Sequence, residues 1–424
     1  LPMYAKKQIT ILEDDLPNIS KKLIESIEYS ANQYQTDSDK TMKLIADINR
    51  NIAPSLIVKR KLSNTLKEDD TEIITLTENQ YFLLRAIQNI RRASISGCAG
   101  SGKTLLAMKK AQMANSSGYK TLLCCYNTLL GEKFSAFSSD EFGMVGGNFH
   151  SIIYTIMRND FGMSHYSISN VINDDNKLME IFISNNLSKF EALIIDEAQD
   201  FSPIQLEIME LLLIDNGILY CFWDNNQRLL RSDFKLPNDL QQFILDINLR
   251  NTKRIFEMVK RFYYQSIPIF NKGPEGQDIK ICSPYNPLRL KQLKQKLTNE
   301  ILELINNEGV APQDIIVLTY KSKESSVLND FSIPGVKVST FNNKLNDECI
   351  NIETVRRFKG LESRVVILTE FDDYNAMNDY ELWENLCYVA TSRARNYLII
   401  IPSEDALVRM KKVSQDFGAR QIGN

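Results

Sequence analysis

Cysteine and histidine are scarce in this chain. Seven cysteines and two histidines occur among its 424 residues, and no two cysteines form a CxxC pair. An odd number of cysteines argues against a disulfide framework, and two histidines are too few for a typical zinc site. We therefore predict free thiols, buried at Cys124 and Cys125 within an apolar run, and a reducing, cytoplasmic compartment.

Long apolar runs and an excess of one charge are also missing. No stretch reaches the roughly 18 apolar residues that cross a membrane, and no signal peptide is recognisable, so we expect no membrane contact. The 50 basic and 53 acidic side chains give a formal net charge of -3. Many nucleic-acid binders are basic overall, so a nucleic-acid surface here would have to be a local stripe on a neutral body.

The composition that remains is that of a globular protein. Hydrophobic residues make up 43% of the chain and charged residues 24%, values far from those of a disordered chain. The length predicts two or three domains. The chain opens with Leu1-Pro2-Met3, which is compatible with a fragment or a cloning remnant and leaves room for a missing upstream domain.

The first 72 residues are polar, with apolar side chains at helical spacing. Two sets have this spacing: Leu23, Ile24 and Ile27, then Met42, Ile45 and Ile48. The pattern predicts a small helical region over residues 1–72. A short basic cluster at residues 59–61 is interpreted as a solvated helix face.

Alternating strands and helices follow. In residues 73–245 we expect strands at Ala93–Ser96, Thr121–Cys125, Ala192–Ile195 and Ile218–Trp223, with helices from Lys103 and around Ile204–Leu213. In residues 246–424 we expect strands at Ile315–Leu318, Val336–Ser339, Val365–Leu368 and Tyr397–Ile401, with helices over 252–264, 287–306 and 379–391. This alternation predicts an α/β fold with two domains, each built on a parallel sheet.

A glycine-rich loop lies between the first expected strand and its helix. Residues 97–104 read GCAGSGKT and fit the pattern G-x-x-x-x-G-K-[ST]. Glycines let the loop curl so that its N–H groups face phosphate oxygens, the lysine reaches the β and γ phosphates, and the threonine binds Mg²⁺. We therefore predict a nucleoside triphosphate site at Gly97, Gly100, Ser101, Gly102, Lys103 and Thr104.

A second chemical signal follows about ninety residues later, where an apolar strand ends in two carboxylates, Asp196 and Glu197. The first is predicted to hold Mg²⁺ together with Thr104. The second is predicted to polarise the attacking water as a general base. The glycine-rich loop and this strand end together predict NTP hydrolysis.

The segment Asp196–Asp200 (DEAQD) resembles motif II of superfamily 1 helicases of the UvrD/Rep-like group. Other segments resemble further motifs in that family's order: Leu76–Gln80 (Q motif), Tyr126–Thr128 (Ia), Phe149–Ser151 (Ib), Asp224–Gln227 (III), Asn248–Thr252 (IV), Thr354–Glu362 (V) and Tyr388–Arg395 (VI). The resemblance covers roughly residues 75 to 402 and implies two RecA-like P-loop NTPase domains.

The resemblance also implies roles for individual residues. Gln80 would read the adenine edge and select ATP, Gln227 would sense the γ-phosphate, and Glu362 would bind the ribose. Contacts to DNA are implied for Asn127, Thr128, His150, Thr354 and Arg356.

Two arginines of the second predicted domain, Arg250 and Arg393, match motifs IV and VI. Cations against the γ-phosphate oxygens stabilise phosphoryl transfer. We expect both to reach the phosphate only when the two domains close, although a helix cap for Arg250 and a surface charge for Arg393 are the structural alternatives.

The chain departs from the UvrD-like pattern at several points. Arg356 stands where that family has histidine, and Leu229-Leu230 stand where it has a tryptophan; we expect Trp223 in the core. The spacing leaves no room for full 1B or 2B accessory domains. This compact form is most similar to the helicase half of nuclease–helicase proteins that carry an upstream nuclease-related (NERD) domain, although residues 1–72 hold no nuclease carboxylate–lysine set.

Three hypotheses follow. The first is an ATP-dependent helicase or translocase on single-stranded or partly duplex DNA. The second is an ATPase switch that regulates a linked or partner nuclease with little unwinding. The third is a superfamily 1 ATPase directed to RNA.

Overall fold

The computed structural model describes residues 21, 22, 25, 61–79, 81–138, 143–185, 187–227, 234–263, 267–342, 344–371 and 380–410. The chain divides into two compact units, Leu1–Lys61 and Leu62–Asn424. In the first unit only Lys21, Lys22, Glu25 and Lys61 are described, the first three in helical conformation. The apolar sets predicted for this region therefore lie outside the described residues.

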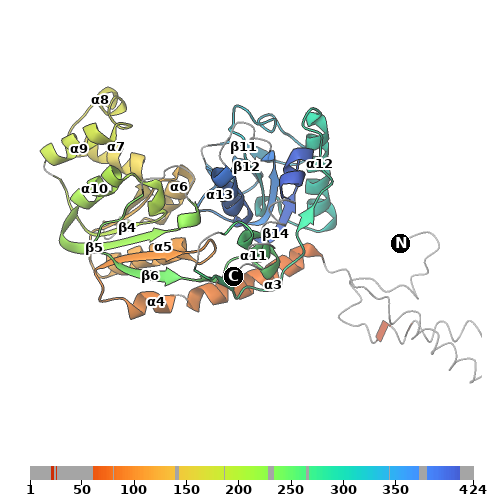
Figure 1. Cartoon of the computed structure of the whole chain (residues 1–424), viewed down its shortest axis with the longest axis horizontal. Helices are drawn as coiled ribbons and strands as arrows, with labels where there is room; N and C mark the ends of the chain where they lie inside the picture. Colours follow the sequence, from red (N-terminus) through yellow and green to blue (C-terminus); the bar gives the residue numbers. More distant parts are fainter. Residues whose placement is uncertain are drawn as a thin grey trace, which may run out of the picture. The chain divides into compact units, whose positions relative to one another are not determined.

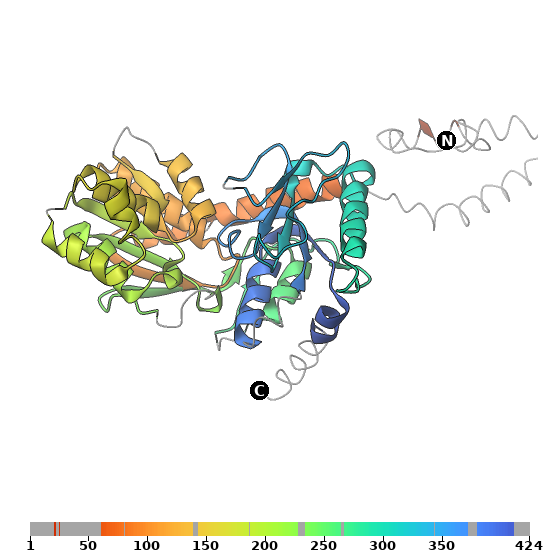
Figure 2. The same ribbon diagram turned by 90° about the horizontal axis from the view of Figure 1, so that it is seen from above.

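The second unit opens with two helices and a first α/β half, which we define as residues 81–245 (Figures 1 and 2). The helices are α3 (Leu62–Asn79), α4 (Tyr81–Ala86), α5 (Lys103–Ser116), α6 (Thr128–Phe137), α7 (Phe149–Asn159), α8 (His165–Ser169), α9 (Asp175–Ser184) and α10 (Pro203–Leu211), with the 3₁₀ turns η3 (Ala198–Asp200) and η4 (Asn225–Gln227). The strands are β1 (Arg92–Gly97), β2 (Thr121–Cys125), β3 (Val145–Asn148), β4 (Phe190–Ile195), β5 (Leu213–Trp223) and β6 (Gln241–Leu245).

The first half is a doubly wound parallel sheet. Its strand order is β3-β2-β4-β5-β1-β6, and every paired register is parallel. Along β2, Leu122 and Cys124 join one hydrophobic cluster while Leu123 and Cys125 join another. Side chains alternate between the two faces of a strand, so both faces of this sheet are buried under helices.

The second half, residues 246–410, repeats the theme. Its helices are α11 (Lys253–Lys260), α12 (Leu290–Leu302) and α13 (Tyr380–Thr391), with the π-turn η5 (Glu303–Asn307) and the 3₁₀ turn η6 (Pro312–Asp314). Its strands are β7 (Ile247–Asn248), β8 (Phe270–Asn271), β9 (Lys280–Ile281), β10 (Ile315–Thr319), β11 (Val338–Thr340), β12 (Ile350–Thr354), β13 (Ser363–Thr369) and β14 (Ala394–Ile400).

Six strands of the second half form another parallel sheet, in the order β11-β12-β10-β13-β14-β9. The short strands β7 and β8 pair separately. Apolar residues of α12 and of the sheet, among them Leu297, Val317 and Ile352, form a cluster on one face. The predicted fold class, α/β with two parallel sheets, is confirmed.

One hydrophobic cluster continues from the first half into the second. It contains Phe222 of β5, Leu318 of β10 and Trp383 of α13, all fully or almost fully buried. Burying a side chain of this size contributes roughly 1.5–3 kcal/mol relative to leaving it in water. The two sheets therefore share an apolar core, and a site between them is held from both sides.

The helix α3 extends from the second half toward the first, where α4 packs on α5 (Figure 2). Leu62 and Leu66 at its start are buried in the cluster of the second sheet. This helix runs through residue 72, the predicted end of the N-terminal region. The domain limits 1–72, 73–245 and 246–424 remain predictions.

Most predicted elements are confirmed with small shifts at their ends, but the helices α4 and α6 to α9 and the strands β3, β6 to β9 and β12 were not predicted. β3 contains two glycines, and β6 is a half-exposed edge strand, so neither has the apolar run that predicts a buried strand. No helix in the described part of the chain is long and apolar enough to cross a membrane.

Candidate active site

The glycine-rich loop leaves β1 at Gly97 and enters α5 at Lys103. Gly100 and Gly102 have φ of 73° and 81°, a region that side chains disfavour. A Cβ on Gly100 would also lie 2.3 Å from the Nδ2 atom of Asn248. The loop therefore needs glycine both for its curl and for the close approach of the second half.

The first turn of α5 has the features of an anion-binding site. Side chains cap the start of every helix from α6 to α10, but no described side chain caps α5. The hydroxyl of Ser101 is buried and has no hydrogen-bond partner among the described residues. Free N–H groups at a helix start and an unpartnered hydroxyl fit the oxygens of a phosphate.

Lys103 lies across its own loop. Its Nζ atom donates to the carbonyl oxygens of Gly97 (2.8 Å) and Cys98 (2.9 Å) and lies 3.5 Å from Oδ2 of Asp224. The lysine is buried, and these oxygens, together with the nearby carboxylates of Asp196 and Glu197, compensate its charge. A phosphate would provide stronger compensation.

Asp196 follows the last residue of β4 and is fully buried. Neither carboxylate oxygen has a hydrogen-bond partner among the described residues. Burial and the charge of Glu197 raise its pKa, while the Thr104 side chain and Lys103 act in the opposite direction. Two unpartnered oxygens beside a threonine hydroxyl fit the oxygen ligands that Mg²⁺ prefers. The oxygen atoms of Thr104 and Asp196 therefore fit the role of Mg²⁺ ligands that the sequence predicted.

Glu197 has a strained backbone, with φ of 54°. Its Oε2 atom accepts a hydrogen bond from Gln199 (2.5 Å) and lies 3.6 Å from Nζ of Lys359. Burial alone would raise the pKa of this carboxyl, but the charges of Lys359 and Lys103 hold it below its usual range. The group is therefore ionised at neutral pH, as a general base must be.

Lys359 lies within the segment that resembles motif V, and the sequence predicted no role for it. It is 2% exposed, and its Nζ atom donates to Oδ1 of Asp200 and to the carbonyl of Gln227, both at 2.6 Å. Burial raises the pKa of Asp200, and Lys359 opposes this shift. A lysine inside the apolar sequence Phe358–Leu361 was the available signal, because a buried lysine needs a carboxylate partner.

The loop after β5 lies between the glycine-rich loop and Asp196, because β5 separates β1 from β4 in the sheet. Oδ2 of Asp224 accepts a hydrogen bond from Nε2 of Gln227 at 2.8 Å. Oε1 of Gln227 accepts one from Nη2 of Arg393 at 3.3 Å. The predicted γ-phosphate sensor thus connects the two halves.

Arg393 is 1% exposed, so it is not a surface charge. Its Nε and Nη1 atoms donate to the carbonyls of Val389 (3.0 Å) and Leu361 (3.1 Å). Burial lowers the pKa of the guanidinium to about 10, and the nearby Arg250 adds to this, so the group remains charged at neutral pH. The structure brings Arg393 against Gln227 of the first half. The expectation that Arg393 reaches the phosphate only when the two domains close stays a prediction.

Tyr388, on α13, is a further residue without a predicted role. Its hydroxyl accepts a hydrogen bond from the N–H of Ala99 (2.7 Å) and lies 3.4 Å from Oδ2 of Asp224. The side chain is fully buried. Motif VI thus contacts the glycine-rich loop directly.

Arg250 and Glu362 form an ion pair through Nε and Oε2. The backbone N–H of Arg250 donates to the carbonyl of Gly100 at 3.2 Å. Burial opposes ionisation of Glu362, but the charges of Arg250 and Arg395 lower its pKa. The helix cap considered for Arg250 is not what the structure shows, because Thr252 occupies the N-cap position of α11.

Two asparagines hold this segment in place. Nδ2 of Asn248 donates to the carbonyl of Ala99 at 2.8 Å, and Nδ2 of Asn251 donates to the carbonyls of Ser392 (3.1 Å) and Ala394 (2.5 Å). Both asparagines are buried. They join motif IV to the glycine-rich loop on one side and to motif VI on the other.

The predicted DNA contacts lie at the carboxyl ends of the strands. Asn127 caps α6, and its Nδ2 atom donates to the carbonyl of Arg356 at 3.1 Å. Thr128 beside it is exposed. The structure therefore brings motif Ia and motif V together through Asn127 and Arg356.

His150 and Thr354 both contact neighbouring residues of the protein, and neither side chain is fully exposed. The His150 ring packs edge-on against Tyr126, with 5.3 Å between centroids. Thr354 is mostly buried, and its hydroxyl accepts from the N–H of Arg357 at 3.1 Å. Trp223 is half-buried, and its Nε1 atom donates to Ser94 at 2.9 Å.

Gln80 and the pair Leu229-Leu230 lie outside the described residues. All seven cysteines are described, and each is a free thiol. No cluster of three or more histidine, cysteine, aspartate or glutamate side chains that could hold a metal occurs among the described residues.

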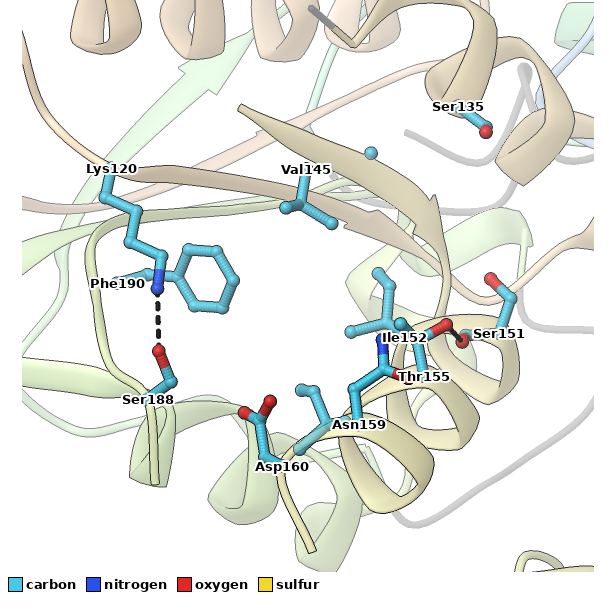
Figure 3. Close-up of a pocket in the computed structure, with 12 residues that line it drawn as sticks. Lys120, Ser135, Val145, Ser151, Ile152, Thr155, Asn159, Asp160, Ser188 and Phe190 are labelled. Atoms are coloured by element: carbon cyan, nitrogen blue, oxygen red, sulfur yellow. Dashed lines mark hydrogen bonds between the residues drawn. The ribbon is translucent and has the colours of Figure 1, made fainter. Parts of the chain in front are cut away.

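A separate pocket of about 330 Å³ opens at the amino ends of β2, β3 and β4, away from the glycine-rich loop (Figure 3). Lys120 borders it, with Nζ donating to Ser188 at 2.8 Å and lying 4.8 Å from the centre of the Phe190 ring. None of the predicted site residues lines this pocket.

Two curated proteins are similar to this chain. The first, "Probable DNA helicase II homolog" of Mycoplasma genitalium, is 21% identical over 290 residues, which cover 61% of this chain and 37% of that protein. The second, "Probable DNA helicase" of Mycoplasma pneumoniae, is 22% identical over 284 residues, covering 58% of this chain and 50% of that protein. The chain thus spans half or less of the length of these relatives.

Two solved structures also match. "Crystal structure of Arterivirus nonstructural protein 10 (helicase)" has a TM-score of 0.38 at 15% identity, covering 77% of this chain and 63% of that chain. "The structure of PRRSV helicase" has a TM-score of 0.39 at 14% identity, covering 78% and 56%.

A family model matches residues 91–305, which include the glycine-rich loop, Asp196 and Arg250. This match extends over just over half of the 424 residues. The chain therefore belongs to the family described as "Schlafen group 3, DNA/RNA helicase domain".

Proposed function

We propose that this chain is an ATP-dependent superfamily 1 helicase or translocase that acts on single-stranded DNA and hydrolyses ATP between two RecA-like domains. The observation that carries the proposal is the assembly of one buried site from both halves. Asp196 and Glu197 come from the first half and Arg393 from the second, with Gln227 in contact with Arg393. Membership of a helicase-domain family supports NTP hydrolysis.

In this proposal the residues of the first half bind and activate. The glycine-rich loop and Lys103 would hold the β and γ phosphates, and Thr104 and Asp196 would hold Mg²⁺, which would supply positive charge against the phosphate oxygens. Glu197, ionised beside Lys359, accepts a proton from the attacking water. Gln80 would select adenine and Glu362 would bind the ribose.

The residues of the second half stabilise charge. Arg393 carries a buried positive charge and would bind the developing negative charge on the γ-phosphate oxygens, aided by Arg250. Gln227 would report the state of the γ-phosphate to Arg393, with which it shares a hydrogen bond. Hydrolysis would then alter contacts between the halves and move the DNA-facing residues Asn127 and Arg356, which are linked to each other.

The test is ATP hydrolysis by the purified chain alone, with single-stranded DNA, and with RNA of the same length. We expect DNA to stimulate turnover, and Lys103→Ala to lower it at least about 100-fold. Retained hydrolysis in the lysine variant would refute the site assignment. A Lys109→Ala variant, which removes a lysine of the same helix whose side-chain hydrogen bond is exposed, serves as a control.

A second candidate, an RNA-directed ATPase, is favoured by the family description, which names both DNA and RNA. Stimulation by RNA and not by DNA would select it. Hydrolysis indifferent to both polymers would select the third reading, a switch for a linked or partner nuclease. We also propose that the chain is related to the helicase half of NERD-containing proteins. We propose a cytoplasmic location, which the free thiols support because they fit a reducing compartment.

A further inference from the structure

The helix α3 is anchored on the second half. Leu62 and Leu66 are buried there, and the N–H of Leu62 donates to Oε2 of Glu308 at 2.9 Å. The carbonyl of Leu66 accepts from Nδ2 of Asn396 at 3.4 Å. These contacts fix the amino-terminal part of α3 through its backbone and its apolar side chains.

Asp70, one turn further along α3, makes contacts of a different kind. Its side chain is 5% exposed and faces two arginines of the second half. Arg395 approaches with two atoms, Nη2 at 2.9 Å from Oδ2 and Nε at 2.8 Å from Oδ1. Arg364 also contacts Oδ2 and is shared with Asp314, at 3.0 Å. A buried, two-atom pairing of this type fixes the position of a guanidinium.

Arg395 continues toward the candidate active site. Its Nη1 atom donates to Oε1 of Glu362 at 3.4 Å, and the other oxygen of Glu362 pairs with Arg250. The backbone N–H of Arg250 then donates to the carbonyl of Gly100, in the glycine-rich loop. Alternating acids and bases therefore connect α3 to the loop that would hold the phosphates.

We propose that Asp70 is a positioning residue that couples the seating of α3 to nucleotide binding through Arg395, Glu362 and Arg250. Glu362 lies between two guanidinium groups and divides its charge between them. While Asp70 holds two atoms of Arg395, Glu362 keeps its pairing with Arg250. When Asp70 is withdrawn, Arg395 draws Glu362 away, and Arg250 loses its partner.

Through this coupling, the position of α3 would regulate nucleotide binding. The helix is the first element of its unit and follows directly on residues 1–61. A force transmitted along the chain into α3 would displace Asp70. This displacement would alter the nucleotide site through Arg395, Glu362 and Arg250, and α3 would not have to bind a ligand. The inference rests on the proposed function in one respect, the binding of nucleotide beside Glu362.

The test compares Asp70→Asn with Asp314→Asn. Both variants remove one carboxylate from Arg364, but only the first removes a partner of Arg395. We expect Asp70→Asn to weaken binding of a fluorescent ADP analogue about 3- to 10-fold, and Asp314→Asn to change it less than about twofold. Thermal unfolding midpoints that match between the variants would exclude a general loss of structure.

Two further measurements separate the possible failures. In an Arg395→Met background, the effect of Asp70→Asn should disappear; its persistence would overturn the coupling through Arg395. Equal effects of the two asparagine variants would do the same. Hydrogen exchange of the Leu249 and Arg250 amides, which bond to Gly100, should quicken in Asp70→Asn even without nucleotide. A wild-type chain that binds no ADP would refute the proposed function, whereas unchanged exchange would refute the coupling itself.

Discussion

The two halves contribute opposite charges to the interface between them. The buried acids come from the ends of strands in the first sheet: Asp196, Glu197, Asp200 and Asp224. Of the buried cations beside these acids, Lys359 and Arg393 come from the second half and Lys103 comes from the first. Lys359 forms an ion pair with Asp200, while the carboxylate oxygens of Asp196 have no hydrogen-bond partner among the described residues.

This difference separates the charges that are paired within the protein from those that are available to bind a ligand. The pairing of Lys359 with Asp200 stabilises the interface, because an unpaired charge would be costly in so buried a place. The unpartnered Asp196 and the uncapped start of α5 instead have capacity for a cation and an anion. The predictions below test this division in order of expected effect.

Removal of the second half's buried guanidinium has the largest expected effect. Arg393→Ala should lower kcat for ATP hydrolysis by about 1,000-fold, because an arginine on the γ-phosphate is worth roughly 10³–10⁵ in rate. Nucleotide binding, measured separately with an ADP analogue, should persist. As a control, Arg254→Ala removes an exposed arginine of the same half and should leave kcat unchanged. Normal turnover in Arg393→Ala would break the proposed division of roles.

Lys359→Met tests how much the ion pairs of Lys359 with buried carboxylates contribute to stability. It leaves Asp200 and Glu197 buried without their cation, so the free energy of unfolding should fall by about 3 to 5 kcal/mol. Asp200, whose pKa burial already raises, can offset this loss by taking up a proton. A folded-state pKa above the unfolded value gives stability at low pH that is lost as pH rises. The deficit should therefore narrow when thermal unfolding is measured at pH 5 instead of pH 8, and Asp200→Asn should restore part of it.

Tyr388→Phe tests a single hydroxyl at the same interface. Losing the hydrogen bond from Ala99 should lower kcat/KM for ATP about 3- to 10-fold, the range expected for one such bond. Tyr320→Phe is the matched control, since that hydroxyl is also buried in the shared core but donates, among the described residues, to the Cys387 sulfur at 3.5 Å and to no group of the glycine-rich loop. Equal kinetics for the two variants would remove Tyr388 from the site.

Asp69 gives the smallest expected effect and extends the comparison to an acid that forms no ion pair with a residue in the described part of the chain. Burial, then Glu72 and Asp70, raise its pKa to about 6. The folded protein therefore binds a proton more tightly than the unfolded chain, and stability falls as pH rises from about 4 to 6. Asp69→Asn should flatten this part of the profile of unfolding midpoint against pH. A decrease of the same size in both proteins would contradict the assignment.

The sequence predicted those parts of the site that lie within one continuous segment. The glycine-rich loop and the strand ending at Asp196 each combine a chemical pattern with a local structure, and both are found where expected. Their predicted roles await experiment. The buried strands β2, β4, β10 and β13 were predicted from their apolar runs, which burial on both faces of a parallel sheet produces directly, whereas the helices α4 and α6 to α9 were not predicted.

The remaining parts depend on contacts between distant segments. Lys359 and Asp200 are 159 residues apart, and Tyr388 and Ala99 are 289 apart. No periodicity within either segment encodes such a pair, because it depends on how the two sheets pack. The path from Asp70 to Glu362 was hidden for the same reason, since Asp70 lies in a region where only amphipathic helices were predicted.

The apolar cluster shared by the two sheets also determines how the chain loses its structure. Neither half can melt without exposing apolar surface on the other, so denaturation should be one cooperative transition. The sequence has two tryptophans, Trp223 in the first half and Trp383 in the second. Replacing each in turn with phenylalanine leaves one fluorescent reporter per half, and the two urea midpoints should coincide. Motion between the halves would then be a sliding of packed surfaces rather than a wide separation.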